Sequence, residues 1–124
     1  MATRSKLRGI ETWLIVLIAA HSAAVGCFLL FATRWGAAFG GWGEVEPVFF
    51  ARQAGVFHIV AAIGYLLEYF RYRGIGLLMT AKSVAVIFLV GSMLIEPQPW
   101  VVPLSALGDG AMALAAWLVH RRAR

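Results

Sequence analysis

Four long apolar stretches constrain the fold of this chain more than any other feature of its sequence. They cover residues 10–32, 48–70, 74–95 and 101–119. Each has about the 20 residues that an α-helix needs to cross a hydrocarbon core of about 30 Å. Helices are required because backbone polar groups cannot remain unsatisfied in lipid. The sequence therefore predicts an all-α integral membrane protein, with residues 1–124 forming a single membrane domain built as an antiparallel four-helix bundle.

The composition agrees with this prediction. Hydrophobic residues make up 61% of the chain and charged residues 14%, whereas a soluble domain carries about 25% charged residues. A water-soluble fold of this length could not bury so much apolar surface, so membrane lipid is the first predicted partner. The only cysteine, Cys27, excludes an internal disulfide and a metal site built from cysteines. The apolar stretch continues past Cys27, which predicts a membrane helix rather than a signal peptide.

The charged residues alternate between the two sides of the predicted bundle. One side carries Glu44, Glu46 and Glu96. The other side carries basic residues in both tails and in the second connection: Arg4, Lys6, Arg8, Arg71, Arg73, Arg121, Arg122 and Arg124. The positive-inside rule then predicts that both termini are cytoplasmic, in a bacterial-type inner (plasma) membrane. A nucleic-acid partner is not expected, because such proteins carry their basic residues on one contiguous face.

The three predicted connections differ in length and composition. Residues 71–74 and 96–99 are tight turns, which predicts that the last three helices follow one another as antiparallel neighbours. The connection over residues 33–47 is longer and rich in glycine and tryptophan. Tryptophan favours the boundary between lipid and water. This loop is therefore predicted to lie in the outer interface of the membrane.

Ionisable side chains within the predicted spans are costly in lipid and need a partner or a function. Their depths suggest two pairs, Arg52 with Asp109 near the outer side and Glu68 with Lys82 near the inner side. Two structural ion pairs that fix the register of the bundle are one interpretation. A site for a substrate or for protons is the other.

Two histidines lie at the midpoints of neighbouring predicted helices. His21 and His58 are thus expected at the same depth, as the axial ligands of a b-type haem would be. Neutral histidines that form hydrogen bonds with Ser22, Tyr65 or a backbone carbonyl would give the same pattern. His58 and Tyr65 also share one helical face, which could bind a quinone headgroup or relay protons. That face could equally be a polar stripe directed to the centre of the bundle.

The second predicted helix opens with Arg52-Gln53-Ala54-Gly55, which resembles the Arg-x-x-Gly start of DoxX-like small membrane proteins. Lys82, Asp109, the chain length and the four-helix layout add to this resemblance, which covers residues 48–120. Members of the group resemble subunits of quinol-linked oxidoreductases or proteins of unknown role. The resemblance therefore implies a compact four-helix bundle and an accessory role near a redox complex.

The sequence contains no motif for catalysis, so we expect no catalytic activity, and no metal site is expected either. The predicted function is an accessory or scaffolding subunit of a larger membrane complex, with other membrane subunits as partners. One alternative is a redox protein that binds haem or a quinone at His21, His58 and Tyr65. A small oligomeric transporter is another. The sequence leaves the cofactor open between haem b, quinone and none.

Overall fold

The computed structural model describes residues 2–124, and over that range the chain forms five helices and no strand. Four of the helices are long and apolar enough to cross a membrane: α1 (Ala2–Phe31), α3 (Phe49–Tyr72), α4 (Gly76–Ile95) and α5 (Val101–Ala123). The fifth, α2 (Thr33–Phe39), is short and follows α1 directly. The predicted all-α four-helix fold is confirmed, and the chain is a small polytopic membrane protein.

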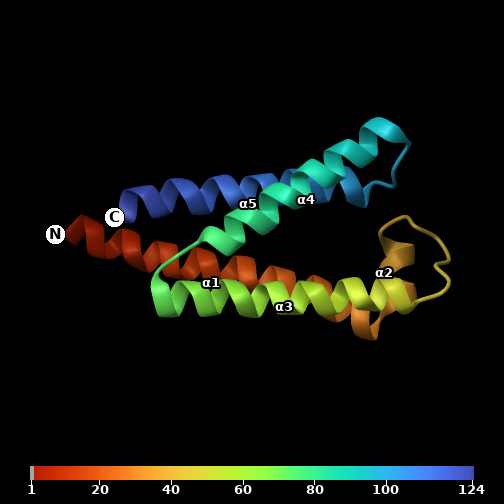
Figure 1. Ribbon diagram of the computed structural model, residues 1–124, viewed down its shortest axis with the longest axis horizontal. Coiled ribbons are helices and arrows are strands. Elements are labelled where there is room, and N and C mark those ends of the chain that lie inside the picture. The colour runs from red at the N-terminus through yellow and green to blue at the C-terminus, as the bar shows by residue number, and fades with distance from the viewer. Residues whose placement is uncertain (1) are drawn as a thin grey trace.

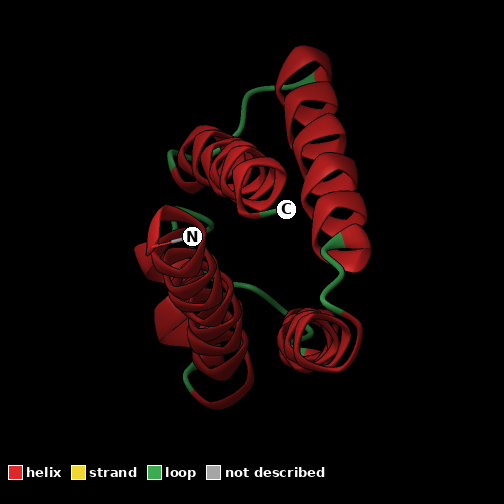
Figure 2. Ribbon diagram, turned by 90° about the vertical axis from the view of Figure 1, so that its left-hand side faces the viewer, coloured by secondary structure: helices red, strands yellow, loops and turns green. Residues whose placement is uncertain are grey.

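The axes of α1, α3 and α5 are nearly aligned with one another, whereas α4 is tilted across α5 (Figure 1). Both chain ends and the α3–α4 turn lie at one end of the bundle, which we call the termini end. The opposite end, where α2 lies, is called the α2 end. The α1 helix packs against both α3 and α5, but no Cα atom of α3 lies within 8 Å of a Cα atom of α5. Figure 2 shows this separation along the bundle.

The connection that was predicted as a loop is helical in its first half. At the start of α2 the Thr33 hydroxyl donates a hydrogen bond to the Leu29 carbonyl (2.6 Å), which satisfies a polar group near the end of α1. At its other end, the Trp100 indole donates to the Phe39 carbonyl across a distance of 3.1 Å. The α2 helix is thereby fastened to the start of α5 and lies across the end of the bundle.

Two glycines allow a close backbone contact between α1 and α3. A Cβ atom at Gly26 of α1 would lie 2.6 Å from the Gly55 carbonyl oxygen, and one at Gly55 would lie 2.7 Å from the Gly26 carbonyl oxygen. Small residues allow membrane helices to approach until their backbones touch, which increases the van der Waals attraction between them. The α1 and α3 backbones therefore touch at this depth.

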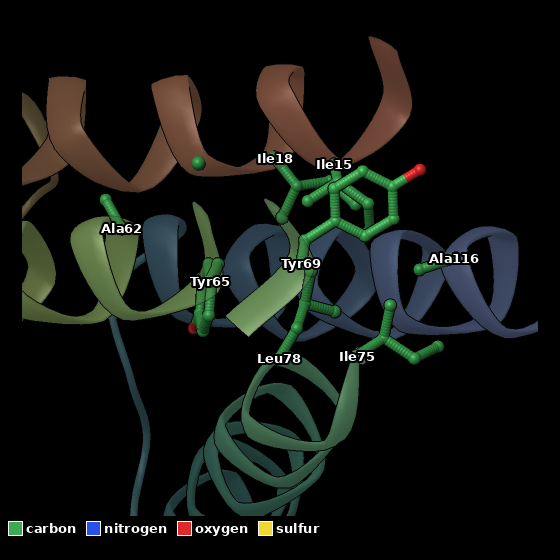
Figure 3. Close-up of a cluster of buried hydrophobic side chains, with 9 residues drawn as sticks. Ile15, Ile18, Ala62, Tyr65, Tyr69, Ile75, Leu78 and Ala116 are labelled. Carbon is green, nitrogen blue, oxygen red and sulfur yellow. The ribbon is translucent and has the colours of Figure 1, made fainter. Parts of the chain in front are cut away.

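The hydrophobic core occupies the half of the bundle near the termini end. Tyr69 of α3 is fully buried there, together with Ile15 of α1 and Leu78 of α4 (Figure 3). The Tyr69 hydroxyl shares a 2.9 Å hydrogen bond with the Thr12 hydroxyl, so the one polar atom of this buried side chain has a partner. The helices are thus packed around this hydrophobic core near the termini end, and the core does not extend to the α2 end.

The glycine contact generates a first prediction. Gly26→Ala or Gly55→Ala should destabilise the protein by about 1–3 kcal/mol, because the added methyl group would meet the backbone of the facing helix. The matched control is Gly91→Ala in α4, where a Cβ atom would have no neighbour within 4 Å. Unfolding in mixed micelles measures the difference. Equal effects at the three positions would contradict the proposed role of the glycine contact.

Candidate functional site

A buried ion pair joins α4 to α5 in the middle of the bundle. Lys82 Nζ lies 2.7 Å from Asp109 Oδ1, and the two side chains are only 6% and 16% exposed. Two charges in a membrane interior are tolerated when each neutralises the other. Removing one partner of a buried pair is strongly destabilising, since the other charge is left uncompensated. This pair therefore fixes how α4 lies on α5.

The predicted partner of Asp109 was Arg52, and the structure corrects this. Arg52 is on α3, which has no close backbone approach to α5. It lies instead in the first turn of α3, exposed, beside a small hollow at the α2 end that Arg34 also lines. The prediction matched the two residues by depth, and depth does not reveal which helices are neighbours.

The predicted partner of Lys82 was Glu68, and here too the structure differs. The Glu68 carboxylate accepts hydrogen bonds from the backbone N–H groups of Gly76 (3.0 Å) and Leu77 (2.7 Å) at the start of α4. That helix has no side-chain cap of its own at Ile75. The N–H groups of a first helical turn lack partners within the helix, and the helix dipole favours a negative charge beside them. Glu68 thus caps α4 from across the α3–α4 turn.

An apolar pocket of about 700 Å³ occupies the α2 end of the bundle. All five helices contribute to its lining, which includes Val25 of α1, Ala51 of α3, Leu89 of α4 and Val102 of α5. Above it, the aromatic rings of Phe28, Trp35, Phe39 and Trp100 follow one another with centroids 5.3–5.6 Å apart. The pocket forms because α4 packs against α5 and α3 packs against α1, so that α3 and α5 leave a space between them.

His58 is the one ionisable side chain among the residues that line this pocket. The other polar groups among the lining side chains are the Ser105 hydroxyl and the indole N–H groups of Trp35 and Trp42. On α3, His58 lies seven residues further from the α2 end than Ala51, and it is exposed rather than buried. The apolar pocket therefore contains a single ionisable group, which α3 contributes.

The other two residues of the predicted site do not line the pocket. Tyr65 is 4% exposed and belongs to the hydrophobic core. His21 is exposed on α1. The predicted group of His21, His58 and Tyr65 is therefore divided, with His58 in the pocket, Tyr65 in the core and His21 outside both.

The residues do not fit a haem held between His21 and His58. Axial ligation places the flat porphyrin between two imidazoles, so the helices that carry them must stand well apart. Here the α1 and α3 backbones touch at Gly26 and Gly55, and a Cβ atom at Gly26 would lie 3.2 Å from the Cβ atom of His58. No space for a porphyrin remains between these two helices at the depth of His58.

One ion pair near the termini end was missed by the sequence reasoning. Glu11 of α1 contacts His120 of α5 through a carboxylate–imidazole hydrogen bond, and Glu11 is buried. Both residues lie at the edges of their apolar stretches, on the same side of the predicted bundle. Their shared depth in the predicted bundle is the sequence signal that indicates this pair.

Comparison with known proteins gives no relative for this chain. No protein-family model matches it, and neither a curated protein nor a solved structure does. The class of protein is therefore defined by the structure itself, as a four-helix membrane protein with an apolar pocket and a buried ion pair.

The ion pair generates the second prediction. Lys82→Met and Asp109→Leu should each destabilise the protein by about 3–5 kcal/mol, whereas the double variant should recover most of this loss. A double-mutant cycle, measured by unfolding in mixed micelles, gives the coupling energy. The matched control cycle is Arg52→Gln with Asp109→Asn, whose losses should simply add because these side chains belong to helices that are not neighbours. Coupling in the control cycle and additivity in the first would refute the observed pairing.

Proposed function

We propose that the protein binds a lipophilic molecule with a polar head, of the quinone class, in the pocket at the α2 end. The observation that carries this proposal is the position of His58, an imidazole in the lining of an otherwise largely apolar pocket. Ligand sites typically combine an apolar lining with a few polar groups that orient the ligand. His58 and Ser105 are such groups, and both can donate a hydrogen bond to a quinone carbonyl oxygen.

The size and the walls of the pocket support the same class of ligand. Its volume of about 700 Å³ falls within the range of roughly 300–1,000 Å³ that small-molecule sites occupy. The apolar lining suits a ring and the first part of an isoprenoid tail, and Trp35 and Phe39 offer flat faces for stacking. A charged or strongly polar ligand would leave its polar groups unpaired against this lining, at a large cost in free energy.

The polar side chains of the lining support a ligand with a polar head rather than an acyl chain alone. His58 of α3 and Ser105 of α5 both line the otherwise apolar pocket. Hydrogen bonds between polar groups are electrostatically stronger in such a low-dielectric setting. We propose that His58 and Ser105 only bind and orient the ligand. The redox link, which the DoxX-like resemblance implies, is part of the same proposal.

The orientation and the setting of the protein are part of the same proposal. We place the termini end on the cytoplasmic side of a bacterial-type inner membrane, because the basic residues gather at that end. In a Cys27→Ser background, an impermeant thiol reagent added from outside should then label a cysteine at position 44 and spare one at position 4 or 122. Labelling in the reverse pattern would overturn the orientation.

The DoxX-like resemblance and an accessory role remain compatible with this function. The resemblance rests partly on Lys82 and Asp109, which form the ion pair, and on Gly55, which lies at the α1–α3 contact. An accessory subunit of a quinone-linked complex would need such a pocket. A purely scaffolding subunit would not, and this difference makes the pocket the feature to test.

Quinone binding can be measured by tryptophan fluorescence, because Trp35 and Trp42 line the pocket. Titration of a short-chain ubiquinone into the protein in lipid nanodiscs should give saturable quenching. His58→Ala should weaken binding about fivefold to tenfold, the effect of losing one hydrogen bond of about 1–1.4 kcal/mol. The matched control is His21→Ala, which removes an exposed imidazole outside the pocket and should leave the affinity unchanged.

Two results would contradict the proposal. Quenching that rises linearly with the quinone content of the lipid would show partitioning without a site, as expected of a purely scaffolding protein. Saturable quenching that His58→Ala and His21→Ala weaken equally would place the site elsewhere. A filled pocket offers a further check: Ala51→Trp adds bulk to its lining and should abolish saturation.

A further inference from the structure

A second pocket, of about 190 Å³, lies at the termini end and is lined almost entirely by basic residues. Arg8 and Glu11 of α1, Arg73 of the α3–α4 turn, and His120 and Arg124 at the end of the chain form its wall. Residues far apart in the sequence thus bring three guanidinium groups to one hollow. The quinone proposal does not use this pocket, and nothing in that proposal depends on it.

The charges in this pocket are unbalanced. Its single carboxylate, Glu11, is already paired with His120. Within residues 2–124, Arg8, Arg73 and Arg124 take part in none of the ion pairs. The lining side chains therefore carry two net positive charges with His120 neutral and three with it protonated. Like charges held together repel one another unless an anion lies between them.

Arg73 is held toward this hollow by the local backbone and by Tyr69. Its φ of 56° is the left-handed conformation that ends α3, and its N–H donates to the Tyr69 carbonyl (2.9 Å). Its guanidinium carbon lies 5.1 Å from the centre of the Tyr69 ring, within the range of a cation–π contact. Tyr69 is itself fixed by burial and by its bond to Thr12. The arginine is thus partly oriented before any ligand arrives.

We propose that this pocket binds a phosphate group, carried either by an anionic phospholipid or by a soluble phosphate. Guanidinium groups present parallel N–H donors that match the oxygens of a phosphate. The volume of about 190 Å³ is below that of sites for whole organic molecules, so it suits a phosphate group rather than a complete nucleotide. The pocket also lies at the edge of the apolar stretches, where lipid headgroups lie, and basic pockets between membrane helices at that level bind such headgroups.

The test is a native mass spectrometry titration of the full chain in detergent with phosphatidylglycerol, compared with phosphatidylcholine of the same acyl chains. Arg73→Gln and Arg124→Gln should each weaken phosphatidylglycerol binding by about tenfold or more, as expected for the loss of a hydrogen bond to a charged group. The matched controls are Arg71→Gln and Arg122→Gln, which remove the same charge nearby without lining the pocket. They should change the affinity little.

Competition with inorganic phosphate distinguishes the two sources. A lipid site retains phosphatidylglycerol in excess inorganic phosphate, whereas a site for a soluble anion binds inorganic phosphate, with the same dependence on Arg73 and Arg124 and no lipid preference. Either result supports the proposal. It is overturned if pocket and control variants weaken both ligands equally, because binding would then follow overall charge. If Arg73→Gln does not fold, the affinities of Arg124→Gln and Arg122→Gln are compared instead. A weaker affinity in Arg124→Gln alone supports the proposal, and equal affinities overturn it.

Discussion

The pairing of Lys82 with Asp109 is the interaction on which the arrangement of the helices depends most. Lipid offers no solvation for either charge, so each must meet the other, and α4 must stay against α5 for them to do so. The glycine contact joins α3 to α1 nearer the α2 end. With two helix pairs held in this way, α3 and α5 do not meet, and the space between the pairs at the α2 end becomes the pocket.

The two ends of the bundle consequently serve different purposes. Near the termini end the helices converge on Tyr69 and Leu78, and a packed core provides the stability. At the α2 end the short helix α2 and its aromatic side chains cover a space that the membrane helices leave open. A packed half that supports an open half is what a ligand-binding membrane protein requires, because the pocket need not contribute to folding. His58 lies where these two halves meet.

Sequence reasoning predicted the helices well because the requirement to span a membrane acts on each stretch of about 20 residues independently. It predicted the partners of the charged residues poorly, since those depend on which helices become neighbours. Lys82 and Asp109 were both identified, yet each was assigned a wrong partner. Glu68 could not have been recognised as a cap for α4 without the geometry of the α3–α4 turn.

The pocket itself was beyond the reach of the sequence for a related reason. Its lining residues come from all five helices and are mostly ordinary apolar residues of membrane spans. Only His58 was distinctive, and the depth that it shares with His21 suggested haem. The close approach at Gly26 and Gly55 removes the space that a haem would need. The contact between these two glycines thus excludes a haem between α1 and α3, whereas His58 still lines the pocket.

We propose that a quinone-class ligand lies between the two helix pairs with its head at His58. Photolabelling tests this most directly, using a short-chain quinone with a photoreactive tail and mapping of the labelled peptides. Labels on pocket residues such as Ala51 of α3, Leu89 of α4 and Ser105 of α5, which disappear with excess unlabelled quinone, are the predicted result. Labels confined to the exposed outer face of α4, at Ile87 and Phe88, and not displaced by quinone would contradict it.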